Sequence, residues 1–150
     1  MIKAIIFDWG RTLFDPEKKI ELPDSVEVLA YCKKKGYKIC VASLVRADTI
    51  EEREGQIKNF NLGKYIDDIE VSDEKEKDTI LDNLIKRLDI SRKEILMVDD
   101  RMVKSIKYGN KNGHPTVWLQ HGPFSNELPN IETGIPTHII KSLIELKNII

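Results

Sequence analysis

Five polar residues of this sequence have the types and spacing needed for phosphate chemistry: Asp8, Ser43, Lys75, Asp99 and Asp100. Carboxylate oxygens are the ligands that Mg²⁺ prefers in proteins, while a hydroxyl and a lysine ammonium can bind the oxygens of a phosphate. A carboxylate can also attack phosphorus, once a cation has reduced its repulsion with the anionic substrate. The set therefore suits phosphoryl transfer through an aspartyl-phosphate.

Most of these residues directly follow an apolar, strand-like segment. The expected strands cover residues 2–7, 37–42, 66–71, 95–98, 116–119 and 138–140. Helical patterns lie between them, at residues 24–35, 47–59, 80–88 and 102–112, and a last one follows Ser142. Such alternation predicts a three-layer, Rossmann-like α/β fold with a mainly parallel sheet of five or six strands. Parallel strands bring their carboxyl ends to one edge, so the polar residues should meet there.

Local signals predict where several helices begin and end. Asp73 or Asp78 is expected to cap the helix over residues 80–88, and Ser142 the last helix. Ser91 and Glu94 match a capping box, which predicts a single turn before the strand at 95–98. The irregular stretch 120–136 carries three of the six prolines and is expected to be a mobile loop.

The order of the motifs resembles the haloacid dehalogenase (HAD) superfamily over the whole chain. The family's first motif, Asp-x-Asp-x-Thr-Leu, is matched by Asp8-Trp9-Gly10-Arg11-Thr12-Leu13. Its second motif, a Ser or Thr after the second strand, falls on Ser43. Its third is a lysine before the helix that leads to the fourth strand, which gives Lys75, with Lys77 as the alternative. The fourth, an apolar strand that ends in acidic residues, is met by Asp99-Asp100.

The resemblance implies a role for each of these residues. Asp8 would be the nucleophile, Lys75 would assist catalysis, and the expected cofactor is Mg²⁺. The implied metal ligands are Asp8, the backbone carbonyl of Gly10, Asp100 and its neighbour or substitute Asp99. The implied phosphate-binding residues are Ser43 and Lys75.

The sequence departs from the family pattern at two places. Gly10 replaces the aspartate that would act as general acid and base, and glycine cannot transfer a proton. A positioned acid–base group contributes about 10²–10⁴ in rate, so ordinary phosphatase chemistry should be severely slowed. The second departure follows the fourth motif, where Lys104 and Ser105 occupy the positions of a further acidic residue.

These matches and departures leave alternative functions open. One is a Mg²⁺-dependent phosphatase-type hydrolase, and the other is a catalytically inactive HAD-like domain with a binding or regulatory role. A response-regulator receiver domain is a more distant alternative. Residues 14–43 and 43–75 are too short for the family's inserted cap domain, so the site should be open. It would suit a phosphorylated small molecule or a macromolecular phosphoester, or be closed by a protein partner, a second copy or residues 120–136.

Composition limits the remaining possibilities. The 150 residues fit one domain, here residues 1–150. With 24 basic and 25 acidic residues, no overall field attracts nucleic acid or an anionic membrane. No apolar run approaches the length of about 18 residues that a membrane span needs, and no export signal is present. Cys32 and Cys40 are interpreted as reduced thiols, which predicts a cytoplasmic protein.

Overall fold

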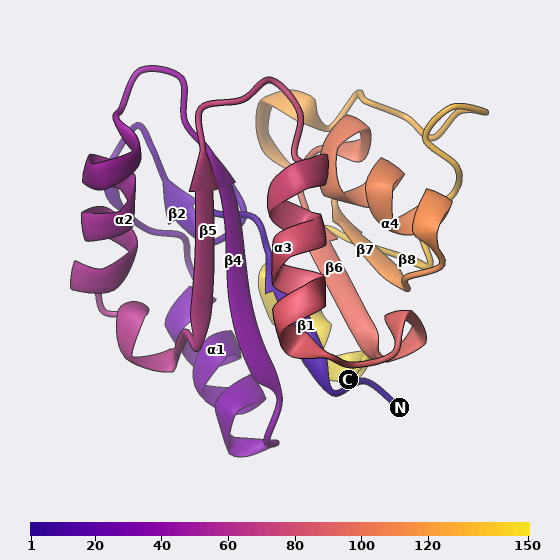
Figure 1. Cartoon of the computed structure of the whole chain (residues 1–150), viewed down its shortest axis with the longest axis horizontal. Coiled ribbons are helices and arrows are strands. Elements are labelled where there is room, and N and C mark those ends of the chain that lie inside the picture. Colours follow the sequence, from indigo (N-terminus) through magenta and orange to yellow (C-terminus); the bar gives the residue numbers. More distant parts are fainter.

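The computed structural model describes all residues, 1–150, and has a parallel six-stranded sheet at its centre (Figure 1). The strand order is β5-β4-β1-β6-β7-β8. The strands are β1 (Ala4–Phe7), β4 (Lys38–Leu44), β5 (Asp68–Ser72), β6 (Ile95–Asp99), β7 (Thr116–Leu119) and β8 (His138–Ile140). β1 lies between β4 and β6, which places Asp8 between the ends of those two strands. The predicted fold class is confirmed.

Helices cover both faces of the sheet and make the fold three-layered (Figure 1). The helices are α1 (Ser25–Lys34), α2 (Ile50–Asn59), α3 (Asp78–Leu88) and α4 (Lys107–Asn112). Side chains alternate along β1, so that Ile5 and Phe7 pack with α1 and α2, while Ala4 and Ile6 pack with α3 and α4. All four β1 residues are fully buried, as expected for a central strand that is covered on both sides.

Several predicted boundaries need correction. β4 continues through Ser43 and Leu44, because both pair with β5. No aspartate side chain caps α3, which begins directly after Lys77. The expected helix over 102–112 consists of a π-helical turn, Met102–Ile106, followed by α4. The chain ends in the 3-10 segment Leu143–Asn148 rather than in an α-helix.

Two short strands near the first motif were not predicted from the sequence. β2 (Phe14–Asp15) and β3 (Ile20–Glu21) form a small antiparallel hairpin directly after that motif. Two-residue strands are too short to give a periodic pattern.

The rest of the segment before β4 is α1, and only α2, a short turn and β5 lie between β4 and α3. The structure therefore has no cap domain, as expected. None of its helices has the length and apolar character that a membrane span requires.

Candidate active site

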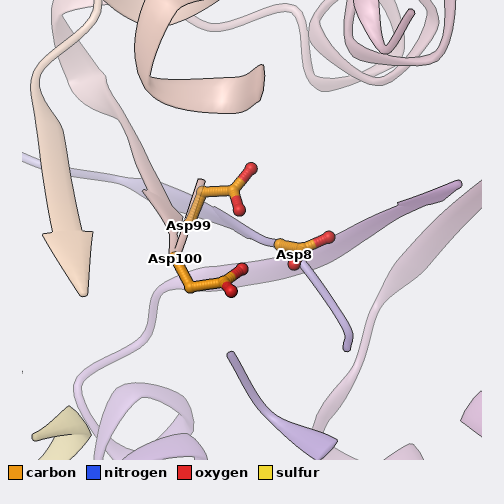
Figure 2. Close-up of side chains that lie close together, drawn as sticks. All are labelled: Asp8, Asp99 and Asp100. Atoms are coloured by element: carbon orange, nitrogen blue, oxygen red, sulfur yellow. The ribbon is translucent and has the colours of Figure 1, made fainter. Parts of the chain in front are cut away.

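Three aspartates meet at the carboxyl edge of the sheet, where β1 and β6 end. One carboxylate oxygen from each of Asp8, Asp99 and Asp100 lies within 4.8 Å of the others. Figure 2 shows the side chains of Asp99 and Asp100 extending toward Asp8. Asp99 and Asp100 are almost fully buried, and the Asp8 side chain is 13% exposed. Such a concentration of carboxylates repels itself unless cations or protons intervene.

Lys77 supplies one of those cations. Its Nζ donates to Asp8 Oδ1 at 2.6 Å, to Asp99 Oδ2 at 3.2 Å and to Ser105 Oγ at 3.3 Å. The lysine side chain is only 3% exposed. Although burial disfavours the ammonium, the charges of Asp8 and Asp99 raise the pKa of Lys77 above its ordinary value. Lys77 is therefore charged and fixed beside the predicted nucleophile.

The prediction of Lys75 as the lysine that faces the site is wrong, and the alternative, Lys77, occupies that position. Lys75 is exposed and does not line the pocket. Its backbone carbonyl is what the surrounding structure uses, as an acceptor for Arg46 and Lys104. Lys77 directly precedes α3 and lies three and four residues before the buried Ile80 and Leu81. It therefore extends the buried face of that helix, whereas Lys75 does not.

We expect the two lysines to differ sharply in their effect on folding. Lys77→Met leaves the carboxylates of Asp8 and Asp99 without their cation, which should lower the free energy of unfolding by about 3–5 kcal/mol. Lys75→Met, the matched control, should change it by less than about 0.5 kcal/mol. Urea denaturation at pH 7 measures both values. Equal effects of the two substitutions would contradict the placement of Lys77.

The hydrogen bonds of Asp99 and Asp100 separate their roles. Asp99 Oδ1 accepts from the backbone N–H of Arg101, and Oδ2 accepts from the N–H of Ser105 and from Lys77. Burial opposes ionisation of Asp99, but Lys77 and these hydrogen bonds lower its pKa. Asp99 is therefore an ionised anchor for Lys77. Its two oxygens are already used by the protein itself.

Asp100, in contrast, has a buried oxygen without a partner. Its Oδ2 makes no hydrogen bond, and Oδ1 lies 3.5 Å from Thr12 Oγ1. The hydroxyl of Thr12 accepts from the backbone N–H of Asp100 and lies 3.4 Å from Asp8 Oδ2. Burial, together with the charges of Asp8 and Asp99, raises the pKa of Asp100 to about 9. Burial and Asp99 also raise the pKa of Asp8.

These groups fit a divalent cation. The unpartnered oxygen of Asp100 and the oxygens of Asp8 form a hard, anionic donor set of the kind that Mg²⁺ prefers. Gly10 lines the pocket around these residues, and its backbone carbonyl accepts no hydrogen bond from the chain. Asp8, Asp100 and the Gly10 carbonyl are therefore the best candidate ligands, whereas Asp99 has other partners.

We expect Asp100→Asn to stabilise the metal-free protein. The folded-state pKa of Asp100, about 9, lies above its ordinary value of 3.8. The unfolded chain therefore loses this proton first, so the stability contributed by Asp100 is fully present below pH 3.8 and is lost as the pH rises toward 9. Asparagine removes this loss, which should raise the free energy of unfolding at pH 7 by about 1–2 kcal/mol and Tm by about 2–8 °C. Thermal unfolding of both proteins in the presence of a chelator measures the difference in Tm.

The same variant also tests the metal site. If Asp100 is a ligand, added Mg²⁺ should raise the Tm of the wild type and leave the Tm of Asp100→Asn nearly unchanged, because ligands stabilise only a state that binds them. Equal shifts in both proteins would place the cation elsewhere.

Ser43 lies where the second motif predicts it, at the edge of the same pocket. Ser43 is 1% exposed, and its Oγ accepts a hydrogen bond of 2.6 Å from Arg53 Nη1. Because Arg53 donates to this oxygen, the hydroxyl proton remains free to point toward a ligand. Arg53 also donates to Leu44 O and to Asp48, and its Nε is buried without a partner.

The pocket around these residues has a volume of about 580 Å³ and is rich in cations. Seven lysine and arginine residues line it, against four aspartates. Residues 120–136 contribute Phe124, whose ring lies 3.8 Å from the guanidinium of Arg101. Sequence analysis missed Arg53, although it precedes the buried Ile57 of α2 by one helical turn and so shares its inward face.

The sequence profile of the haloacid dehalogenase-like hydrolases matches residues 1–119. The chain belongs to this family. It is an uncapped member, with Gly10 two residues after Asp8. No curated protein is similar enough in sequence to be a recognisable relative.

Solved structures of HAD-like proteins share the fold. A protein of uncharacterised function from Listeria monocytogenes serotype 4b is 22% identical, with a TM-score of 0.78 over 99% of this chain and 96% of that one. A putative phosphatase from Clostridium difficile is 16% identical, with a TM-score of 0.79 over 99% and 98%. An L-2-haloacid dehalogenase is 12% identical, with a TM-score of 0.81 over the same shares. At these identities the likeness establishes the fold alone.

Proposed function

We propose that this protein is a Mg²⁺-dependent phosphoester hydrolase that acts through an aspartyl-phosphate at Asp8. The observation that carries the proposal is the position of Asp8. Its carboxylate accepts from the buried ammonium of Lys77 and lies in one cluster with the unpartnered Oδ2 of Asp100, in a cationic pocket. We further propose that residues 1–150 form one domain and that it works in the cytoplasm, since Cys32 and Cys40 are free and buried.

The residues divide the proposed reaction between them. An Asp8 carboxylate oxygen attacks phosphorus, and the bond from phosphorus to the leaving oxygen breaks. Lys77 and the hydroxyl of Ser43 would stabilise the charge on the other phosphate oxygens. Water then attacks the phosphorus of the aspartyl-phosphate, and the bond between phosphorus and the Asp8 oxygen breaks. The proton of the water leaves with the phosphate or passes to solvent, and Asp8 is restored as a carboxylate. A Mg²⁺ ion held by Asp8, Asp100 and the Gly10 carbonyl would offset the repulsion between the nucleophile and the anionic substrate.

Gly10 determines which phosphoesters this site can use. No side chain stands at that position to protonate the leaving oxygen, so the leaving group has to depart as an anion or take its proton from water or from the substrate itself. Turnover should therefore be faster for leaving groups of low pKa, such as aryl and acyl phosphates, than for alkyl phosphates.

Phosphate release from aryl, acyl and alkyl phosphates, each with Mg²⁺ and with a chelator, tests the proposal. We expect Mg²⁺-dependent release that is fastest for the aryl and acyl esters. Beryllium fluoride, which mimics a phosphoryl group on a carboxylate, should protect the wild type against unfolding in the presence of Mg²⁺. The absence of both release and protection would refute the proposal.

Gly10 and Lys104 favour a second candidate, a non-catalytic HAD-like domain that binds a phosphorylated partner or metabolite. Lys104 places a cation in the pocket where the family resemblance leads us to expect a carboxylate. Binding of Mg²⁺ and phosphate without turnover of any ester would select this candidate.

A further inference from the structure

Two cations of the pocket rim converge on one backbone oxygen. Arg46 Nη2 and Lys104 Nζ each donate to the carbonyl oxygen of Lys75 at 3.0 Å. Arg46 also donates to the carbonyls of Val45 and Glu74. The two charged groups are therefore neighbours, although 58 positions separate them along the chain. A carbonyl oxygen can accept two hydrogen bonds, so this single acceptor holds both cations beside each other.

Neither cation has a carboxylate partner. The other arginines of the rim are neutralised, since Arg11 pairs with Glu17, Arg53 with Asp48, and Arg101 with Glu127. Neither Arg46 nor Lys104 takes part in any ion pair of the structure. The chain as a whole carries a net charge of −1. The positive charge at this point is therefore a local feature of the pocket.

The pair stands at the carboxyl edge of the sheet, beside the proposed reaction site. Arg46 follows Ser43 by three residues after β4, and Lys104 follows Asp99 by five after β6. Both line the pocket that contains Asp8. Since β1 lies between β4 and β6 (Figure 1), the segments that carry the two cations follow the strands on either side of the strand that leads to Asp8. A ligand that has its phosphate at Asp8 would extend toward them.

We propose that Arg46 and Lys104 bind a second anionic group of the substrate, so that the substrate class is small phosphomonoesters that also carry a carboxylate or a second phosphate. The inference rests on the proposed function and specifies its substrate. Guanidinium and ammonium groups bind both kinds of anion through charge-assisted hydrogen bonds. A pocket of about 580 Å³ has room for a small molecule of this kind.

Binding of phosphonates by calorimetry tests the proposal without requiring turnover. The probes are phosphonoacetate, 3-phosphonopropionate and 4-phosphonobutyrate, at a fixed concentration of free Mg²⁺. Their terminal amides, which have the same length without the second charge, are the controls. We expect at least one acid to bind about 10- to 100-fold more tightly than its amide. Equal binding of every acid and amide would overturn the proposal.

Substitutions then locate the second site. The double variant Arg46→Gln, Lys104→Gln should abolish the preference for the acid and leave binding of the amide unchanged. Lys75→Gln is the matched control, because its exposed side chain lies outside the pocket, and it should keep the preference. Arg46→Lys retains the charge but loses part of the contacts to the backbone carbonyls, so it should keep most of the preference. A preference that survives the double variant would exclude these two residues.

Hydrolysis separates this proposal from the proposed function. Phenyl phosphate and 4-(carboxymethyl)phenyl phosphate differ in a carboxylate that a methylene insulates from the reacting bond. We expect a lower KM for the second ester in the wild type and similar values in the double variant. Hydrolysis of both esters with equal KM would overturn the second site and leave the proposed function standing. Preferential binding of the phosphono acids without hydrolysis of either ester would support the second site and overturn the proposed function.

Discussion

We expect Asp8→Asn to abolish Mg²⁺-dependent phosphate release while the protein remains folded. The amide cannot attack phosphorus. Asp99 cannot replace Asp8, since two backbone N–H groups and Lys77 hold its oxygens, and Asp100 is the proposed ligand of Mg²⁺. Folding should survive because Lys77 keeps Asp99 as its partner, and because the substitution removes a charge that disfavours ionisation of Asp100. Initial rates on an aryl phosphate should fall to the level of the buffer control.

The matched control is Asp15→Asn. Asp15 lies outside the pocket and its carboxylate accepts from the backbone N–H groups of Glu17 and Lys18, which an asparagine oxygen can also do. This variant should retain wild-type rates. Far-ultraviolet circular dichroism and Tm of both variants establish that they are folded. Turnover that persists in Asp8→Asn would show that the nucleophile is another group or that the activity belongs to a contaminant.

The positions of the residues at the carboxyl edge of the sheet could be predicted because they depend on the backbone of the sheet. Asp8, Ser43 and Asp99 lie at or just beyond the ends of three neighbouring parallel strands, and apolar runs identify such strands well. Parallel pairing then fixes that their ends share one edge, whatever the side chains do. The pattern of apolar runs therefore predicts both the fold and the proximity of these three residues.

The choice between Lys75 and Lys77 depends on helix phase, which spacing between motifs does not contain. The two lysines lie in the charged run Asp73–Asp78, where no apolar residue marks the face. Counting back from the later residues gives the phase, because Lys77, Leu81 and Leu84 share one face of α3. A buried lysine is rare unless it is paired, so this phase identifies Lys77 only together with the carboxylates that pair with it.

The contact between Arg53 and Ser43, and the convergence of Arg46 and Lys104, lie further from what a sequence pattern can express. Each depends on side-chain rotamers at the ends of different elements, and on where the loops after β4 and β5 run. Loop paths are set by such polar contacts rather than by periodicity. The arrangement of the cations at the rim is therefore less predictable than the meeting of the aspartates.

Gly10→Asp should raise the rate of phosphate release, because it places a carboxyl group two residues after the nucleophile, where the family resemblance puts the general acid. The structure has room for it. A Cβ built on Gly10 meets no atom within 4 Å, and Gly10 is not among the residues with positive φ. A new acid–base group could recover part of the factor of about 10²–10⁴ that such groups contribute, so we expect a gain of about 10- to 1000-fold.

Gly10→Asn is the matched control for this gain. Asparagine has nearly the same size and can donate a hydrogen bond, but it cannot transfer a proton, so it should leave the rate close to that of the wild type. Proton transfer also predicts which substrates benefit most. The gain from Gly10→Asp should be larger for an alkyl phosphate, whose leaving oxygen needs the proton, than for 4-nitrophenyl phosphate, whose leaving group departs as an anion. The double variant Asp8→Asn, Gly10→Asp should be inactive. A folded Gly10→Asp protein that binds Mg²⁺ and gains nothing on either ester would show that the remaining residues are not arranged for this reaction, which would favour the non-catalytic candidate.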